Sequence, residues 1–201
     1  MPRSVDHEER RAQLADALAR VAARDGLHAV SMRSVAAEAG VSLRLVQYYF
    51  TSKEQLLVGA LRRLEEQSNS RWQARLARIG TDPTPRQVVD TFIEEALPTD
   101  GPSRDFYRVS TAFSGFASTE PALAAEPLAG GVGRLRATVA AAFDDAARAG
   151  DLVAGADPGL EADALVALCN GLSAAVAIGH HTPEHAVDVA QYHLSRLFQK
   201  H

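Results

Sequence analysis

Apolar residues recur along most of this chain at the three- and four-residue spacing that is typical of amphipathic helices. Near the start, Leu14, Leu18 and Val21 form one such stripe within residues 7–25, and Gly26 follows where that helix should end. The alternation of apolar and polar residues that indicates strands is almost absent. We therefore expect an all-α protein of about nine helices with no sheet.

The later helices are predicted from the same spacing and from proline residues near several of their starts. A long helix at residues 53–78 is followed by a loop at residues 80–85. We expect further helices at residues 85–97, 103–118, 130–149, 158–180 and 183–199. A short helical lead from Pro121 towards residue 130 stays an open alternative.

Residues 30–50 contain the same pattern of helix-start signals twice. Ser31 and Ser42 each precede a short periodic segment, where a serine hydroxyl accepts a hydrogen bond from the free amides of the first turn. Gly40 ends the first segment, so a tight turn at residues 40–42 joins the two. Each start also has a hydrophobic staple, formed by Val30 with Val35 and by Val41 with Val46. This arrangement predicts a helix-turn-helix.

A second kind of start signal divides the chain. Ser52 and Gln55 have the spacing of a capping box, directly after an aromatic run that ends at Phe50. We therefore predict an N-terminal three-helix, helix-turn-helix head at residues 1–52. The rest, residues 53–201, is predicted to be a helical body, with the helix at residues 53–78 bridging the two parts.

The charge distribution favours a nucleic-acid contact at one end of the chain. The net charge is −4, but residues 1–63 carry +3 and residues 64–201 carry −7. Cys169 is the only cysteine, which excludes an internal disulfide and suits a reducing cytoplasm. The charged residues 1–9 do not resemble a signal peptide. The uncharged stretch at residues 164–183 contains polar side chains, so we expect a buried helix there rather than a membrane span.

A match at fixed spacing is found in Ala39-Gly40-Val41-Ser42 and in Tyr48-Tyr49-Phe50-Thr51-Ser52-Lys53-Glu54-Gln55-Leu56-Leu57. These residues resemble the DNA-binding domain of the tetracycline-repressor (TetR) family, and the resemblance covers about residues 8–60. The approach to the last two helices through Asp157-Pro158 resembles the BetI-like branch. The resemblance implies an all-helical homodimer that binds double-stranded DNA at a palindromic operator.

The family resemblance also implies which residues contact DNA. The second short helix enters the major groove, and Lys53 holds a phosphate at the start of the next helix. The implied DNA-binding residues are Ser31, Arg33, Ser42, Leu43, Arg44, Leu45, Gln47, Tyr48, Tyr49 and Lys53. Arg44 and Gln47 depart from the glycine and tyrosine that are common in the family. Arginine suits guanine and glutamine suits adenine, although a phosphate contact by Arg44 is an equal alternative.

The body is predicted to bind a small, largely apolar molecule that releases DNA. Asn170 and Ser173 lie on a helix that is apolar nearly all round, where they bond either to a ligand or to neighbouring helices. The candidate ligand-binding residues are Trp72, Phe106, Ser110, Thr111, Phe113, Cys169, Asn170 and Ser173. The last two helices are expected to form a four-helix bundle with a second copy through Leu172, Val176, Val187, Leu194, Leu197 and Phe198.

Two other readings stay open: a TetR-like regulator without a small-molecule ligand, and a small helical enzyme. No Ser/His/Asp or paired-carboxylate arrangement is visible, so we expect neither an enzyme nor a cofactor. His180, His181 and His185 are separated by Thr182-Pro183, which interrupts the helix, so no metal site is expected. Cys169 is more typical of a small apolar filler than of a nucleophile. The favoured function is a cytoplasmic repressor that a small ligand releases from its operator.

Overall fold

The computed structural model describes residues 2–119 and 128–199, and these ranges contain nine α-helices and a short 3-10 helix, η1 (Leu27–Ala29). The helices are α1 (Pro2–Asp25), α2 (Met32–Ala39), α3 (Leu43–Tyr49), α4 (Lys53–Ile79), α5 (Pro85–Ala96), α6 (Gly101–Thr119), α8 (Leu128–Ala149), α9 (Pro158–Ala177) and α10 (Pro183–Leu197). The described ranges contain no β-strand, only a single bridge between Leu152 and Phe198. The all-α prediction is confirmed.

Two predicted helix ends differ from the structure by three residues or more. Helix α1 begins at Pro2 rather than near His7, because its first turns are polar and offer no apolar stripe for periodicity to detect. Helix α9 ends at Ala177 rather than His180, because Gly179 takes a left-handed conformation with φ +74° that turns the chain. The alternative helical lead from Pro121 lies outside the described residues.

The described chain forms two compact units. The first unit contains residues 1–67 and 105–131, and the second contains residues 68–104 and 132–201. Helices α4 and α6 therefore each begin in one unit and end in the other. The first unit extends past residue 52 because Leu56, Leu57 and Leu61 of α4 belong to its core. The functional division at residue 52 stays a prediction.

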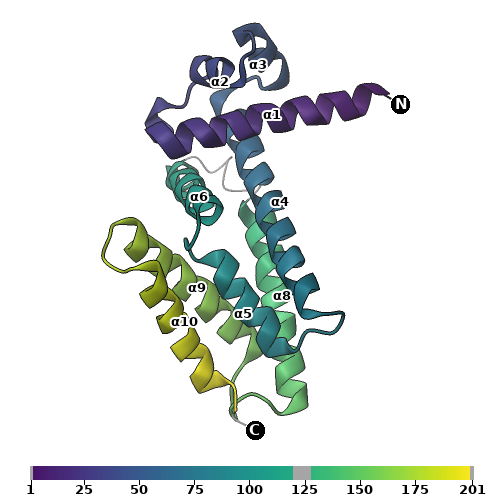
Figure 1. Cartoon of the computed structure of the whole chain (residues 1–201), viewed down its shortest axis with the longest axis vertical. Helices are drawn as coiled ribbons and strands as arrows, with labels where there is room; N and C mark the ends of the chain where they lie inside the picture. The colour runs from purple at the N-terminus through teal and green to yellow at the C-terminus, as the bar shows by residue number, and fades with distance from the viewer. Residues whose placement is uncertain (1, 120–127, 200–201) are drawn as a thin grey trace. The chain divides into compact units, whose positions relative to one another are not determined.

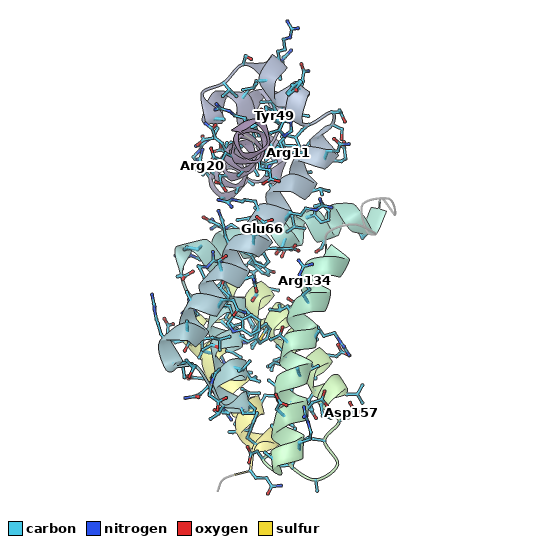
Figure 2. The ribbon with its side chains drawn as sticks, turned by 90° about the vertical axis from the view of Figure 1, so that its right-hand side faces the viewer. Arg11, Arg20, Tyr49, Glu66, Arg134 and Asp157 are labelled. Atoms are coloured by element: carbon cyan, nitrogen blue, oxygen red, sulfur yellow. The ribbon has the colours of Figure 1, made fainter. Side chains whose placement is uncertain are left out.

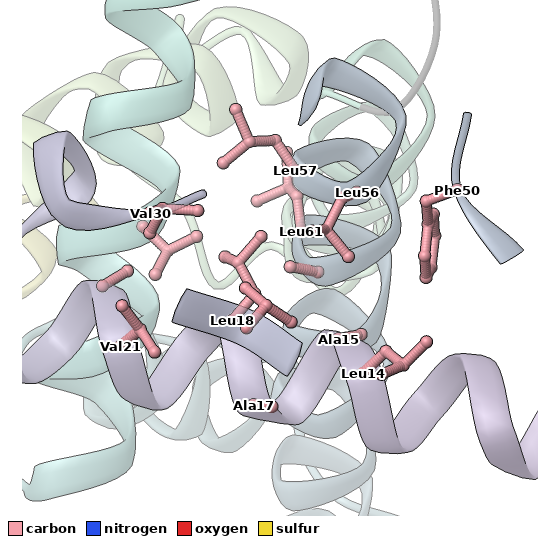
Figure 3. Close-up of a cluster of buried hydrophobic side chains, with 14 of the residues drawn as sticks. Leu14, Ala15, Ala17, Leu18, Val21, Val30, Phe50, Leu56, Leu57 and Leu61 are labelled. Atoms are coloured by element: carbon pink, nitrogen blue, oxygen red, sulfur yellow. The ribbon is translucent and has the colours of Figure 1, made fainter. Parts of the chain in front are cut away.

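In the first unit, α1 passes across the N-terminal part of α4, with α2 and α3 beside it (Figure 1). Leu14 and Leu18 of α1 pack with the leucines of α4 in a cluster that Figure 3 shows at close range. Helix α6 completes this core with Val109 and Phe113, both 1% exposed. The first unit is thus built from two separate stretches of the chain.

An ion-pair network joins α2 to α1. The Glu38 carboxylate accepts hydrogen bonds from Arg20 Nε at 2.8 Å and from Arg24 Nη1 at 2.9 Å. These two hydrogen bonds lower the pKa of Glu38 below its usual value. A carboxyl with a lowered pKa stabilises the fold above its unfolded-state pKa and loses that contribution as the pH falls through its folded-state pKa. Acid should therefore weaken the packing of α2 on α1.

Gly59 of α4 lies against the ring of the buried Phe50, which precedes α4. A Cβ atom at position 59 would lie 2.8 Å from Cε1 of Phe50. We expect Gly59→Ala to destabilise the protein by about 1–3 kcal/mol, because this overlap outweighs the gain of about 1 kcal/mol in helix propensity. Thermal unfolding followed by circular dichroism measures the effect.

Gly133→Ala in α8 is the matched control for that prediction. A Cβ atom there would meet nothing within 4 Å, so only helix propensity acts and the melting temperature should stay or rise. Equal rises for both variants would show that Phe50 does not need the space at Gly59.

Helix α9 of the second unit is buried along one face only. Its buried residues are Ala162, Leu165, Cys169, Leu172 and Ser173. The opposite face is exposed, with Leu160 at 67%, and Ile178 just past the helix end is 81% exposed. By length and composition α9 could cross a membrane, and 28% of its 18-residue apolar stretch is buried. Within a single chain, the buried helix that the sequence predicts is therefore covered along one face.

Three residues of α9 that the sequence analysis singled out lie in different surroundings. The Ser173 hydroxyl donates to the Ala96 carbonyl of α5 at 3.3 Å, which is the neighbouring-helix alternative for that residue. Asn170 is exposed, so its amide meets water and not the apolar interior that the sequence pattern indicated. Burial raises the pKa of the Cys169 thiol to about 12, which keeps it in the unreactive protonated form.

Candidate DNA-reading surface

The turn between α2 and α3 is fixed by local signals that the sequence predicted. Gly40 adopts φ +67°, the left-handed conformation that ends α2 at low strain. The Ser42 hydroxyl accepts from the Leu45 amide at 3.2 Å and so caps α3. Val46, which is fully buried, anchors α3 in the core of the first unit. These contacts set which side chains of α3 face outwards.

Helix α3 presents polar side chains to solvent. Arg44 and Gln47 are exposed, and their side chains make no hydrogen bond or ion pair within residues 2–119 and 128–199. Tyr48 is 71% exposed, whereas Leu43, Leu45 and Tyr49 are half-buried. A short helix whose long polar side chains project without a partner has the form of a major-groove reading helix.

Two other predicted DNA-contacting residues, Ser31 and Arg33, lie at the start of α2. Ser31 Oγ accepts from the Ser34 amide at 3.0 Å, and Ser34 Oγ accepts from the Ser31 amide at 2.8 Å. The Ser31 hydroxyl is thus already used as a cap, a role that sequence reasoning assigned to it as well. Arg33 is exposed, and no bond of its side chain is found among the described residues.

The start of α4 combines a cation with a helix N-terminus. Lys53 is the first residue of α4 and is half-buried. Ser52 Oγ accepts from the Gln55 amide at 3.2 Å, but the Gln55 side chain accepts from the amide and hydroxyl of Thr51 rather than returning to Ser52. The Glu54 amide and the Ser52 hydroxyl lower the pKa of Glu54. Exposed amides beside a lysine favour a phosphate.

The candidate ligand-binding residues are divided between the two units. Phe106, Ser110, Thr111 and Phe113 belong to the first, and Trp72, Cys169, Asn170 and Ser173 belong to the second. Trp72 is 2% exposed and donates from Nε1 to Thr91 Oγ1 at 3.0 Å, so it serves the core of its unit. Thr111 and Asn170 are exposed. Within neither unit do these residues line one pocket.

Two hollows are found on the second unit. One, of about 320 Å³, is lined by Thr99, Pro183, Glu184, Val187 and Asp188. The other, of about 360 Å³, is lined by Thr84, Pro85, Arg86, Asp151, Ser195, Phe198 and Gln199. Neither contains a residue that the sequence suggested for the ligand. The rings of His180, His181 and His185 pack in sequence at 4.7 Å, but no group of three metal-ligating side chains suited to an ion occurs among the described residues.

The residues expected at a dimer interface face into their own chain. Leu172, Leu194 and Leu197 are buried in the core of the second unit, and Val176, Val187 and Phe198 pack against it. Leu194 has no exposed surface and can add nothing to an interface. The exposed face of α9 was missed. Its signal is a second stripe at helical spacing, in Leu160, Ala164, Ala167, Gly171, Ala174 and Ile178.

The capped pair α2–α3, with an exposed polar second helix, defines a helix-turn-helix DNA-binding regulator. Residues 14–60 match the bacterial regulatory proteins of the tetR family, and residues 85–199 match the C-terminal domain of BetI-type transcriptional repressors. The chain belongs to the TetR family of transcriptional regulators, with a C-terminal part of the BetI type.

Individual relatives agree with this assignment. The chain is 33% identical over 117 residues to the transcriptional regulator PksA of Bacillus subtilis, which covers 58% of this chain and 56% of PksA. It is 36% identical over 100 residues to the regulator BetI of Rhizobium meliloti, and this match covers 50% of this chain and 48% of BetI. The chain thus aligns with about half the length of these curated relatives. The structure of a regulator from Saccharomonospora viridis, solved in complex with choline, is similar with a TM-score of 0.85 and 25% sequence identity. The match covers 96% of this chain and 99% of that regulator.

Proposed function

We propose that this protein is a homodimeric transcriptional repressor that binds a palindromic operator in the cytoplasm and leaves it when a small molecule binds. The observation that carries the DNA-binding half is the surface of α3, where Arg44, Gln47 and Tyr48 project without intramolecular polar partners. One exposed polar side chain is common on any protein surface. Here all three lie on the second helix of a capped helix-turn-helix, which is the helix that enters a major groove.

The dimer is supported by the exposed face of α9. Six of the exposed residues from Leu160 to Ile178 form a stripe in alternating steps of four and three, which is the spacing of a coiled-coil seam. Small residues in the middle of the seam allow two copies of α9 to approach closely. Tyr192 of the neighbouring helix α10 is 65% exposed and offers further apolar surface. A two-fold axis there would make the preferred DNA site a palindrome.

Selection of oligonucleotides from a random pool by the purified protein tests this function. The expected result is an enriched palindrome whose half-sites lie about one helical turn, or a multiple of it, apart. Arg44 and Gln47 should make its sequence differ from operators read by relatives with glycine and tyrosine at these positions. Enrichment of no sequence over the starting pool would refute a sequence-specific regulator.

The small-molecule half of the proposal is supported by similar regulators that were solved with ligands and by the course of helices α4 and α6. The regulator from Saccharomonospora viridis was solved with choline, and a multidrug binding protein, EbrR, with imidazole. In this chain, α4 and α6 each contain residues of both units. Arg108 of α6 also donates to the Ala23 carbonyl of α1 at 3.2 Å. A ligand that shifts either helix would therefore also shift the helix-turn-helix.

A thermal-shift screen with choline, other small quaternary amines and apolar metabolites tests release. A hit should raise the melting temperature and weaken the preformed operator complex, and operator DNA should weaken binding of the hit by the same factor. A hit that stabilises the protein without changing operator affinity would contradict release. A screen with no hits would support the alternative of a regulator without such a ligand.

A further inference from the structure

Three aromatic rings from two helices meet at the end of the reading helix. His7 of α1 has its ring centroid 4.6 Å from that of Tyr49 and 6.3 Å from that of Tyr48. The two tyrosine rings lie 5.1 Å apart at 88° to each other. Each pair has the tilted or edge-to-face geometry that aromatic rings prefer. Each of the three rings therefore contacts the other two.

His7 supplies the only member of this triangle that does not come from α3. Tyr48 and Tyr49 are the last two residues of that seven-residue helix, and Tyr48 is largely exposed. Tyr49 is half-buried, and its ring contacts both the His7 ring and the Tyr48 ring. Without the His7 ring, Tyr49 would lose one of these two ring contacts. Rotation of its ring would then also release Tyr48.

The next turn of α1 supports this placement. The guanidinium of Arg11 lies 4.8 Å over the ring of Phe50, the residue that follows Tyr49, and Arg11 and Tyr49 project from the same part of the first unit (Figure 2). Arg10 donates to the Gln13 side chain at 2.6 Å. The face of α1 near α3 thus presents a ring contact and two cations, while Glu8 and Glu9 are exposed.

We propose that His7 is a positioning residue for DNA recognition, which holds Tyr49 and through it Tyr48 in the orientation that contacts the DNA backbone. The proposal rests on the proposed operator binding. Fixing the two rings before binding removes the entropy that would otherwise be lost when they are immobilised against DNA. The aromatic ring of His7 is what matters, and not its charge.

Two substitutions separate the ring from the rest of the imidazole. His7→Ala should weaken operator binding by about three- to tenfold, the size of one or two immobilised side chains. His7→Phe should keep affinity within about twofold of the wild type, because it restores the ring contact. Alanine is a better helix former than histidine, so a loss in His7→Ala cannot come from fraying of α1. Fluorescence anisotropy on the selected operator, with unfolding curves for each variant, measures both effects.

A double-mutant cycle links the effect to the tyrosines. In a Tyr49→Ala background, His7→Ala should cause no further loss, because the ring that it positions is gone. Additive losses would mean that His7 acts independently of Tyr49 and would overturn the proposal. So would an unchanged affinity of His7→Ala, or a His7→Phe variant as weak as His7→Ala, which would point to a direct contact of the imidazole with DNA. A wild-type protein that enriches no operator would instead refute the proposed function.

Discussion

Ala167→Glu should convert the protein from a dimer to a monomer and weaken operator binding by about 10²–10⁴-fold. Ala167 is exposed in the single chain and lies at the centre of the α9 stripe that runs from Leu160 to Ile178. In the proposed dimer, a carboxylate at this position would be buried against its symmetry mate without a partner. Each monomer would then bind one operator half-site independently, and the gain in affinity from linking two DNA-binding heads would be lost.

Sedimentation velocity and operator titration of this variant measure the two losses. Ala141→Glu in α8 is the matched control, because it places the same side chain at another exposed helical alanine. That control should stay dimeric with unchanged affinity. A dimer that survives Ala167→Glu would place the interface away from the exposed face of α9.

Leu194→Glu, the substitution that the sequence pattern suggests for breaking a dimer, should have a different result. Leu194 is fully buried in the core of the second unit, so a charge there costs several kcal/mol of folding stability. We expect loss of the cooperative thermal transition and not a folded monomer. The two variants together distinguish an interface residue from a core residue.

Arg44→Ala should cost about 1–3 kcal/mol on the selected operator and much less on random DNA, if its guanidinium reads a guanine. The exposed Arg44 side chain makes no polar contact within the described residues, so its removal leaves the fold intact. Lys53→Ala at the start of α4 should instead weaken binding equally on all sequences and reduce the salt slope by about one unit.

Titrations on operator and random duplexes at several salt concentrations separate these two effects. Arg134→Ala, which removes an exposed arginine from α8, controls for the change in net charge and should leave both affinities unchanged. Equal losses for Arg44→Ala on the two duplexes would assign Arg44 to the phosphate backbone, the alternative that the sequence leaves open.

The helix-turn-helix was predictable because its determinants are local. Ser31, Gly40 and Ser42 act within four residues of their own position, and the structure shows each of them in the expected cap or turn. The same holds for the prolines at the starts of α5 and α10. Such signals need no knowledge of the tertiary fold, so one sequence suffices to place them.

The faces of α6 and α9 were not predictable in the same way. Helix α9 is apolar nearly all round, so periodicity alone cannot say which stripe its own chain covers. Leu172 was therefore expected at an interface and Asn170 inside, whereas the structure buries the first and exposes the second. Phe113 was expected to line a ligand pocket because nothing in its neighbourhood shows that the end of α6 belongs to the core of the first unit.

The discontinuous core of the first unit has a consequence for how the protein is made. Helices α1 to α3 leave the ribosome early, but Val109 and Phe113, which complete their core, are synthesised only after α5. A nascent chain or a prematurely terminated product without α6 therefore exposes apolar surface and is open to proteolysis. We therefore expect a DNA-reading element that resists proteolysis only once residues 105–119 of α6 have been translated.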